Sequence, residues 1–229
     1  MRAVLSPHLD DAVLSCWSVL ADRAEDAVVI NVFAGVPPHG TGLRWWDRLT
    51  GADDSPARMR ERLAEDAAAL ALAGRRAVNL GALDRQYRDD SGPPPLVELL
   101  AAELPAGAAV YAPAAFGAHE DHVLVRDAAL ELGRRGHPVT LYADIPHAIV
   151  RGWPSWVADD ASSDVDDEWR AQVGGAGEAR IRELDPAERA AKLQAIRSYR
   201  SQFAALDAMT FRSLFDPATL RYEVFWPPS

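Results

Sequence analysis

The sequence predicts an α/β fold, with a Rossmann-like and mainly parallel sheet that carries helices on both faces. Short apolar runs alternate with stretches of helical spacing along most of the chain, which is typical of repeated strand and helix units. The run at residues 27–33 (AVVINVF) is almost wholly apolar, as in parallel strands that are buried on both faces. No internal repeat or low-complexity linker divides the 229 residues, so we expect a single domain over residues 1–229.

Each expected element has its own signal. Apolar runs predict strands at residues 3–6, 27–33, 77–80, 108–112 and 139–143, and an alternating pattern predicts a closing strand at 220–226. Helical spacing predicts helices at residues 12–23, 58–73, 96–104, 122–135 and 186–206. The second of these is followed by Gly74, and the third is preceded by three prolines, which fit the end and the first turn of a helix.

Two segments lack a regular pattern. Residues 35–57 are rich in Gly, Pro and Trp, and residues 150–178 are acidic, so we expect the second segment to be a long loop or lid with little regular structure. Tryptophans in these segments could stack on a substrate or anchor the loops onto the core, and the sequence leaves both interpretations open. They are Trp45, Trp46, Trp153, Trp156 and Trp169.

Charge and composition exclude several classes of function. The formal net charge of −10 opposes sequence-independent binding to nucleic acid or to anionic lipid. No apolar run is long enough to cross a bilayer, and no secretory signal precedes residue 8. Cys16 is the only cysteine, so no disulfide framework is expected. We expect a cytoplasmic protein that acts on a small molecule, without a nucleic-acid partner or membrane insertion.

Two clusters of metal-ligating residue types follow two of the expected strands. His8, Asp10 and Asp11 come directly after residues 3–6, and the segment 119–122 (HEDH) comes after residues 108–112. Because the carboxyl ends of parallel strands meet at one edge of the sheet, we expect the clusters to lie together there. A catalytic zinc site needs three protein ligands and an open position for water, and hydrolysis also needs a base and a proton donor. The two clusters supply enough groups for all of these.

Simpler interpretations exist for the same residues. Asp10 or Asp11 alone could cap the following helix, and either histidine of the second cluster could be a helix-start residue. His147 could face the site, but we expect an ordinary role for it, as for the other histidines outside the clusters. The sequence has no P-loop, no dinucleotide fingerprint after the first strand, no H-E-x-x-H and no G-x-S-x-G.

At these clusters the sequence resembles the PIG-L/LmbE-like zinc-dependent N-deacetylases, which include N-acetylglucosaminyl-phosphatidylinositol and mycothiol-pathway deacetylases. The family's His-Pro-Asp-Asp motif corresponds to residues 8–11 (HLDD), and its His-Pro-Asp-His motif to residues 119–122 (HEDH). Weaker similarities extend over most of the chain. Leu9 and Glu120 replace the two motif prolines at positions that are not ligands, so we expect the chemistry to be kept.

The resemblance implies a metal site and a base. His8, Asp11 and His122 would hold the zinc ion, and Asp10 would be the general base that takes a proton from the attacking water. A site with two histidines and one aspartate also accepts Fe²⁺ or Co²⁺, so the metal itself is left open.

The resemblance also implies roles for four further residues. His119 would be protonated and would stabilise the oxyanion or give a proton to the departing amine, with Asp121 as its orienting partner. Arg62 and Asp84 would bind substrate hydroxyls, typically on a glucosamine ring. The expected reaction is hydrolysis of an N-acyl amide, in particular an N-acetyl amide, on an amino-sugar conjugate or a secondary metabolite.

Two alternatives are kept open. The first is an amidase that acts on a non-sugar conjugate, and the second is a metal- or ligand-binding α/β module without turnover. Assembly into a homo-oligomer, as in many relatives, also remains open.

Overall fold

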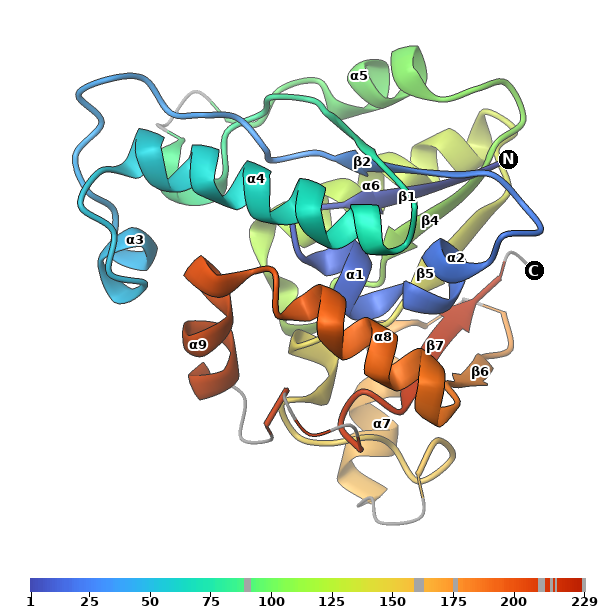
Figure 1. Ribbon diagram of the computed structural model, residues 1–229. Helices are drawn as coiled ribbons and strands as arrows, with labels where there is room; N and C mark the ends of the chain where they lie inside the picture. Colours follow the sequence, from blue (N-terminus) through green and yellow to red (C-terminus); the bar gives the residue numbers. More distant parts are fainter. Residues whose placement is uncertain are drawn as a thin grey trace.

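The computed structural model describes residues 1–88, 92–158, 163–174, 177–209, 213–214, 216 and 218–227. In these residues seven strands form one sheet in the order β3-β2-β1-β4-β5-β7-β6 (Figure 1). The first five strands of this order pair in parallel, and β7 is antiparallel to both of its neighbours. The strands are β1 (Arg2–Ser6), β2 (Ala27–Asn31), β3 (Ala77–Asn79), β4 (Ala109–Pro113), β5 (Val139–Tyr142), β6 (Arg180–Glu183) and β7 (Tyr222–Trp226). The expected Rossmann-like, mainly parallel sheet is confirmed.

Helices cover both faces of the sheet. Alternate side chains of β1 enter different cores, since Val4 packs on one face and Leu5 on the other. The core on the Val4 side includes side chains of α1 (Asp11–Ser15), α2 (Trp17–Ala21), α4 (Ser55–Leu72), α7 (Ser163–Gln172), α8 (Pro186–Ile196) and α9 (Arg200–Met209). The core on the Leu5 side is formed with α5 (Leu96–Glu103) and α6 (Glu120–Arg134). Short elements complete the described chain: α3 (Trp45–Leu49) and the 3-10 turns η1 (Arg85–Tyr87), η2 (Phe116–Ala118) and η3 (His147–Ile149).

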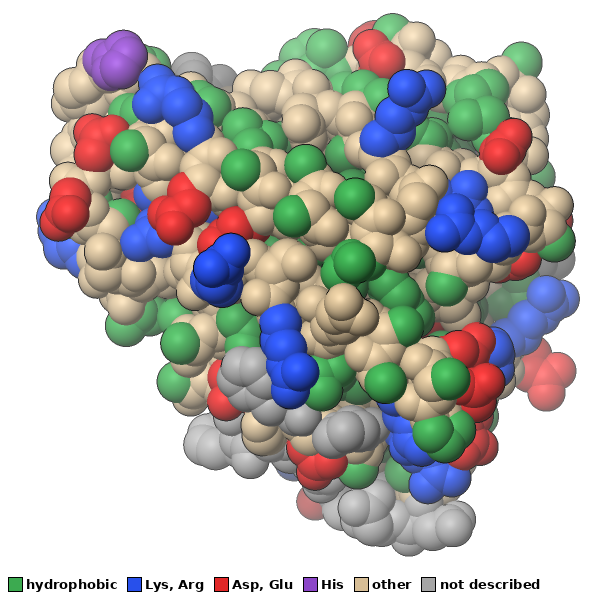
Figure 2. All heavy atoms as spheres, in the orientation of Figure 1, with side chains coloured by type: hydrophobic (Ala, Val, Ile, Leu, Met, Phe, Trp, Pro, Cys, Tyr) green, Lys and Arg blue, Asp and Glu red, His purple; other side chains and the backbone are tan. Residues whose placement is uncertain are grey.

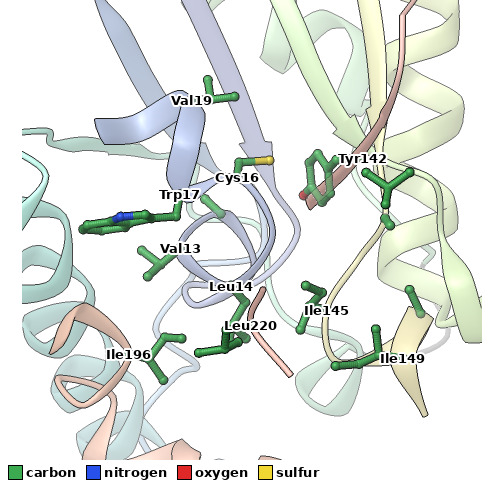
Figure 3. Packing of buried hydrophobic residues seen from close by; sticks show 14 of the residues in the cluster. Val13, Leu14, Cys16, Trp17, Val19, Tyr142, Ile145, Ile149, Ile196 and Leu220 are labelled. Carbon is green, nitrogen blue, oxygen red and sulfur yellow. The ribbon is translucent and has the colours of Figure 1, made fainter. Parts of the chain in front are cut away.

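The expected helix at residues 12–23 is two short helices that meet at Cys16. Their apolar side chains converge with residues from distant parts of the chain, including Ile145, Ile196 and Leu220 (Figure 3). The second helix begins where the buried carboxylate of Glu223 accepts hydrogen bonds from the backbone N–H groups of Trp17 and Ser18. A carboxylate supplied by β7 therefore fixes the start of this helix. The apolar periodicity of residues 12–23 could not predict this start, because Glu223 lies far away in the sequence.

The boundaries of two other helices also differ from the prediction. The expected helix at 186–206 is divided into α8 and α9. Helix α4 begins three residues before the expected start, because Asp54 caps it by accepting from the backbone N–H of Ala57. The prediction that 150–178 has little regular structure is wrong for the part that contains α7, whose Val165 and Trp169 are buried one turn apart. Residues 159–162 and 175–176 of that segment lie outside the described residues. Strand β6 was not predicted because all four of its residues are exposed.

The face of the molecule over α4 and α8 carries acidic and basic side chains interspersed among small apolar ones (Figure 2). The negative net charge is therefore not gathered into one patch on this face. No helix in the described part of the chain is long and apolar enough to cross a membrane.

Candidate metal centre and active site

The two clusters of potential ligands lie where the sheet changes its winding direction. From β1 the chain leaves through α1 and α2 to reach β2, whereas from the adjacent strand β4 it leaves through α6, on the opposite face, to reach β5. Ligands of open α/β sheets bind at such a switch point, beyond the carboxyl ends of the strands. The expectation that both clusters lie together at this edge is confirmed, because the ring centroids of His8 and His122 are 5.2 Å apart.

Hydrogen bonds to side chains hold the turn after β1. The hydroxyl of Ser6 donates to the carbonyl of His8 (2.5 Å) and accepts from the backbone N–H of Ala12 (2.9 Å). One carboxylate oxygen of Asp11 accepts from the backbone N–H of His8 (2.8 Å). Asp10 stands at the N-cap position of α1, yet its side chain makes no capping hydrogen bond. Helix capping therefore does not account for Asp10, whose side chain stays available at the site.

His8, Asp11 and His122 bring ligand atoms to within 4.8 Å of one another. Oδ2 of Asp11 lies 3.5 Å from Nδ1 of His8 and 3.4 Å from Nε2 of His122. Nε2 of His122 is buried and has no hydrogen-bond partner among the described residues. A buried imidazole nitrogen without a partner is costly, and a metal ion held by these three side chains would satisfy it. The residues present therefore fit a zinc site with two nitrogen ligands and one oxygen ligand.

Carboxylates hold the other nitrogen of both histidines. Nδ1 of His122 lies 3.0 Å from the carboxylate of Asp144, and Nε2 of His8 lies 3.0 Å from that of Asp121. Asp144 also accepts from the backbone N–H of Ala115, and Asp121 is paired with Arg88 at 2.6 Å. Such outer carboxylates select the tautomer and the orientation of metal-ligating imidazoles.

A second group of possible ligands consists of His8, His119 and Asp121. Asp121 is already engaged, because its carboxylate faces Arg88 and accepts from the backbone N–H of Arg85. The first group is the better metal site, since its His122 nitrogen lacks any other partner in the described structure.

The charges at the site shift the pKa values of its groups. Burial raises the pKa of Asp10, and the neighbouring charge of Asp11 raises it further. Burial would raise the pKa of Asp11 too, but His122 and His8 hold it well below its usual range. Burial opposes the charged form of both histidines, yet their carboxylate neighbours raise the pKa of each above its ordinary value. Asp10 is thus the carboxylate of the pair with the greater affinity for a proton.

The expected pairing of His119 with the Asp121 carboxylate differs from the structure. Nδ1 of His119 accepts a hydrogen bond from the backbone N–H of Asp121 (3.2 Å), while the Asp121 carboxylate lies against His8. Burial and the neighbouring His8 and His122 lower the pKa of His119 to about 4. In this arrangement His119 is neutral near pH 7 and carries its proton on Nε2, because Nδ1 is an acceptor. In this structure the Asp121 carboxylate therefore orients His8, and the backbone N–H of Asp121 contacts His119.

Arg62 and Asp84 lie beside this cluster. One guanidinium nitrogen of Arg62 is 3.6 Å from the carboxylate of Asp84, which in turn is 4.0 Å from Nε2 of His8. Two buried nitrogen atoms of Arg62, Nε and one terminal nitrogen, have no hydrogen-bond partner among the described residues. The two residues expected to bind substrate are thus close to the ligand set, and Arg62 has hydrogen-bonding capacity to spare.

Sequence reasoning missed three residues that border the site. Asp144 follows β5, so an aspartate at the end of the strand adjacent to β4 was the signal that could have found it. Arg88 follows η1 and carried no motif. His147 was given an ordinary role, yet its ring centroid lies 4.9 Å from that of His122, and burial with the nearby His122 lowers its pKa to about 3.

The structure shows an anchoring role for two of the five loop tryptophans and leaves the side chain of a third, Trp45, exposed. Trp153 and Trp169 are buried and pack against each other, so they anchor the segment after β5 onto the core. Trp45 is 60% exposed on α3, and the indole N–H of its neighbour Trp46 donates to Gln202 on α9.

A doubly wound α/β sheet with a histidine and aspartate cluster at its switch point, and a second buried carboxylate beside it, fits the class of metal-dependent hydrolases. No protein-family model matches the chain, and no curated protein is similar to it at a significant level. Solved structures are similar over nearly the whole chain.

One similar structure is a triple mutant of a deacetylase, Orf2*T, that is involved in the teicoplanin biosynthetic pathway. It is 30% identical with a TM-score of 0.74, and the match covers 99% of this chain and 97% of that one. A second is the A40926 pseudoaglycone deacetylase Dbv21, which is 30% identical with a TM-score of 0.71 and coverage of 99% and 96%. Teicoplanin deacetylase Orf2 also has a structure of a zinc-inhibited form, with 27% identity, a TM-score of 0.73 and coverage of 99% and 97%.

The chain belongs to the PIG-L/LmbE-like zinc-dependent deacetylases. It is a metal-dependent N-deacetylase, and the alternative of a binding module without turnover is set aside.

Proposed function

We propose that His8, Asp11 and His122 hold the zinc ion of this deacetylase. The observation that carries this assignment is the buried Nε2 of His122, which has no partner among the described residues and lies 3.4 Å from the Asp11 carboxylate. A zinc ion bound there acts as a Lewis acid toward the amide carbonyl and makes water a better nucleophile. Asp121 and Asp144 orient the two histidines.

Asp10 is the general base in this proposal. Its carboxylate is 7% exposed, makes no capping bond and has a raised pKa because of burial and the adjacent Asp11. It takes a proton from water as the new C–O bond forms, and it then transfers that proton to the amine nitrogen as the C–N bond breaks. His119 stabilises the oxyanion through Nε2–H. Its neutral ring in the described structure favours this role over that of proton donor.

The substrate we propose is an N-acetylated amino-sugar conjugate. Two similar deacetylases are described as acting in the teicoplanin pathway and on a pseudoaglycone. Arg62 and Asp84 support this choice, because both border the site and Arg62 has buried N–H groups without hydrogen-bond partners in the described structure. Such groups favour a ligand rich in hydroxyls over an apolar amide.

The test is a screen of the zinc-loaded protein against N-acetylglucosaminyl conjugates and against N-acyl amino acids, with released acetate as the readout. We expect turnover on the sugar conjugates. Turnover confined to the non-sugar amides would replace the proposed substrate with the alternative one.

The base is tested by Asp10→Asn, which should lower kcat by about 10²-fold or more with unchanged zinc content, because the variant cannot accept the proton. Asp54→Asn is the matched control, since Asp54 also stands at an N-cap but is exposed, makes the capping bond and belongs to neither group of possible metal ligands. An Asp10→Asn variant as active as the control would remove Asp10 from the mechanism.

We further propose that the protein acts in the cytoplasm on small molecules. The lone, buried Cys16 supports a reducing compartment. Light scattering of the purified chain would decide between a monomer and the homo-oligomer that the sequence leaves open.

A further inference from the structure

His147 forms one wall of the candidate site. It stands in η3, just beyond the end of β5, and its ring centroid lies 4.9 Å from that of His122 and 5.9 Å from that of His119. Its imidazole therefore reaches the ligand set from a different strand end than either sequence cluster.

His147 differs from the other three histidines of the site in its hydrogen bonds. His8 and His122 each face a carboxylate, and His119 accepts from a backbone N–H. Within the described residues His147 has ring contacts but no hydrogen bond. The His147 side chain is half-buried, and an imidazole without a hydrogen-bond partner in the described structure is available at this position to a ligand that enters the site.

Gly117 keeps one edge of this ring uncovered. A Cβ atom at position 117 would lie 3.5 Å from Nδ1 of His147, and the backbone there has a φ of +71°, which disfavours any larger residue. The turn between β4 and α6 therefore passes beside His147 without covering it with a side chain.

We propose that His147 is a further catalytic residue, whose imidazole N–H donates a hydrogen bond to the carbonyl oxygen of the scissile amide. The inference rests on the proposed function. As the water oxygen bonds to the carbonyl carbon, the π electrons of the carbonyl move onto its oxygen, and a donor fixed beside that oxygen strengthens its bond. The proton stays on His147 throughout, and the C–N bond breaks as the electrons return. His119 and His147 approach the oxygen from adjacent strand ends.

The experiment uses zinc-loaded protein and the variants His147→Leu, His147→Phe and His147→Gln. Leu and Phe remove the donor, and Phe keeps a planar ring if Leu prevents folding, whereas Gln restores an N–H group. We expect kcat to fall by about 10²-fold in the Leu and Phe variants with a much smaller change in KM, and to recover at least tenfold in the Gln variant. His39→Leu is the control, because His39 is exposed and belongs to neither group of possible metal ligands.

Zinc content and acetate binding provide readouts apart from activity. Acetate, the product of deacetylation, brings a carboxylate oxygen to the same position, so its Kd should rise several-fold in the Leu and Phe variants and stay unchanged in His39→Leu. A kcat within threefold of the wild type, or a loss of zinc that explains the loss of activity, would overturn the proposal. If the wild type hydrolyses none of the screened amides, the proposed function fails, and the acetate titration alone decides the role of His147.

Discussion

The carboxylate of Asp144 connects two strand ends at the site. It lies 3.0 Å from Nδ1 of His122 and also accepts from the backbone N–H of Ala115, so it ties the loop after β4 to the end of β5. With Nδ1 committed to Asp144, only Nε2 of His122 is left for a metal ion.

Asp144→Ala should lower the zinc affinity by about 10- to 100-fold, because the ring of His122 loses its orienting partner. Asp144→Asn should lose less, since its amide oxygen can still accept from Nδ1–H. Competition with a chromogenic chelator measures the affinity, and Asp127→Ala, at an exposed position of α6, is the control. Equal affinity in Asp144→Ala and the control would contradict the orienting role.

Asp66 gives the protein a pH-dependent stability. Burial raises its pKa to about 7, although Tyr199 and Asn31 donate hydrogen bonds to its carboxylate. The folded state therefore binds a proton below about pH 7, whereas the unfolded chain binds it only near the ordinary aspartate pKa of 3.8. The stabilisation that the protonated Asp66 contributes is complete below the pKa of Asp66 in the unfolded chain. It is lost as the pH rises through the pKa of Asp66 in the folded protein.

Between pH 5 and pH 7 the free energy of unfolding should accordingly fall by about 1.4 kcal/mol per pH unit on account of this group. In Asp66→Asn that share of the slope should vanish. Urea unfolding of the metal-free protein at several pH values measures it, with the exposed Asp53→Asn as a control for the lost charge. Parallel pH profiles for wild type and Asp66→Asn would refute the assignment.

At the scale of elements, a buried ion pair holds the carboxylate that connects β7 with α2, near the beginning of the chain. Lys192 on α8 lies 2.8 Å from Glu223 on β7, both side chains are fully buried, and Glu223 also starts α2. Because α2 directly follows the helix that carries Asp11, this pair helps to hold α1 and its metal ligand in place.

Lys192→Met should reduce the free energy of unfolding by about 3 kcal/mol, since it leaves a buried carboxylate without its countercharge. Arg151→Met breaks an exposed pair with Glu168 and should change stability by less than ~1 kcal/mol. Urea denaturation compares the two variants. Similar effects in both would mean that the buried pair does not stabilise the fold.

At the scale of the whole molecule, the metal ion couples activity to stability. Without it the Asp11 carboxylate lies 3.5 Å from Nδ1 of His8 and 3.4 Å from Nε2 of His122, and that Nε2 has no hydrogen-bond partner among the described residues. Because zinc binds the folded state, 100-fold excess over its Kd should add about 2.7 kcal/mol to the free energy of unfolding.

Thermal unfolding with zinc, with chelator and with zinc restored measures this effect. We expect Tm and deacetylase activity to fall together on chelation and to recover together. Calcium, which prefers six to eight oxygen ligands, should not replace zinc. An Asp11→Asn variant stabilised by zinc as strongly as the wild type would argue against the proposed ligand set.

The sequence alone determined the α/β class, the five parallel strands and the two clusters at their carboxyl ends. These features are local: a buried parallel strand is apolar along its length, and the loop that follows it carries the polar groups. The two clusters could therefore be located before any distance was known, whereas the choice of His8, Asp11 and His122 as ligands came from the resemblance to the deacetylase family.

Only the tertiary structure decided what depends on groups far apart in the chain. The break at Cys16 follows from Glu223, more than two hundred residues away, and the tautomer of His119 follows from a backbone N–H rather than from the nearby carboxylate. Asp144 and His147 reach the site from the end of β5, with no motif around them. Side-chain partners across strands are set by how the sheet and helices pack, and periodicity along the chain cannot encode them.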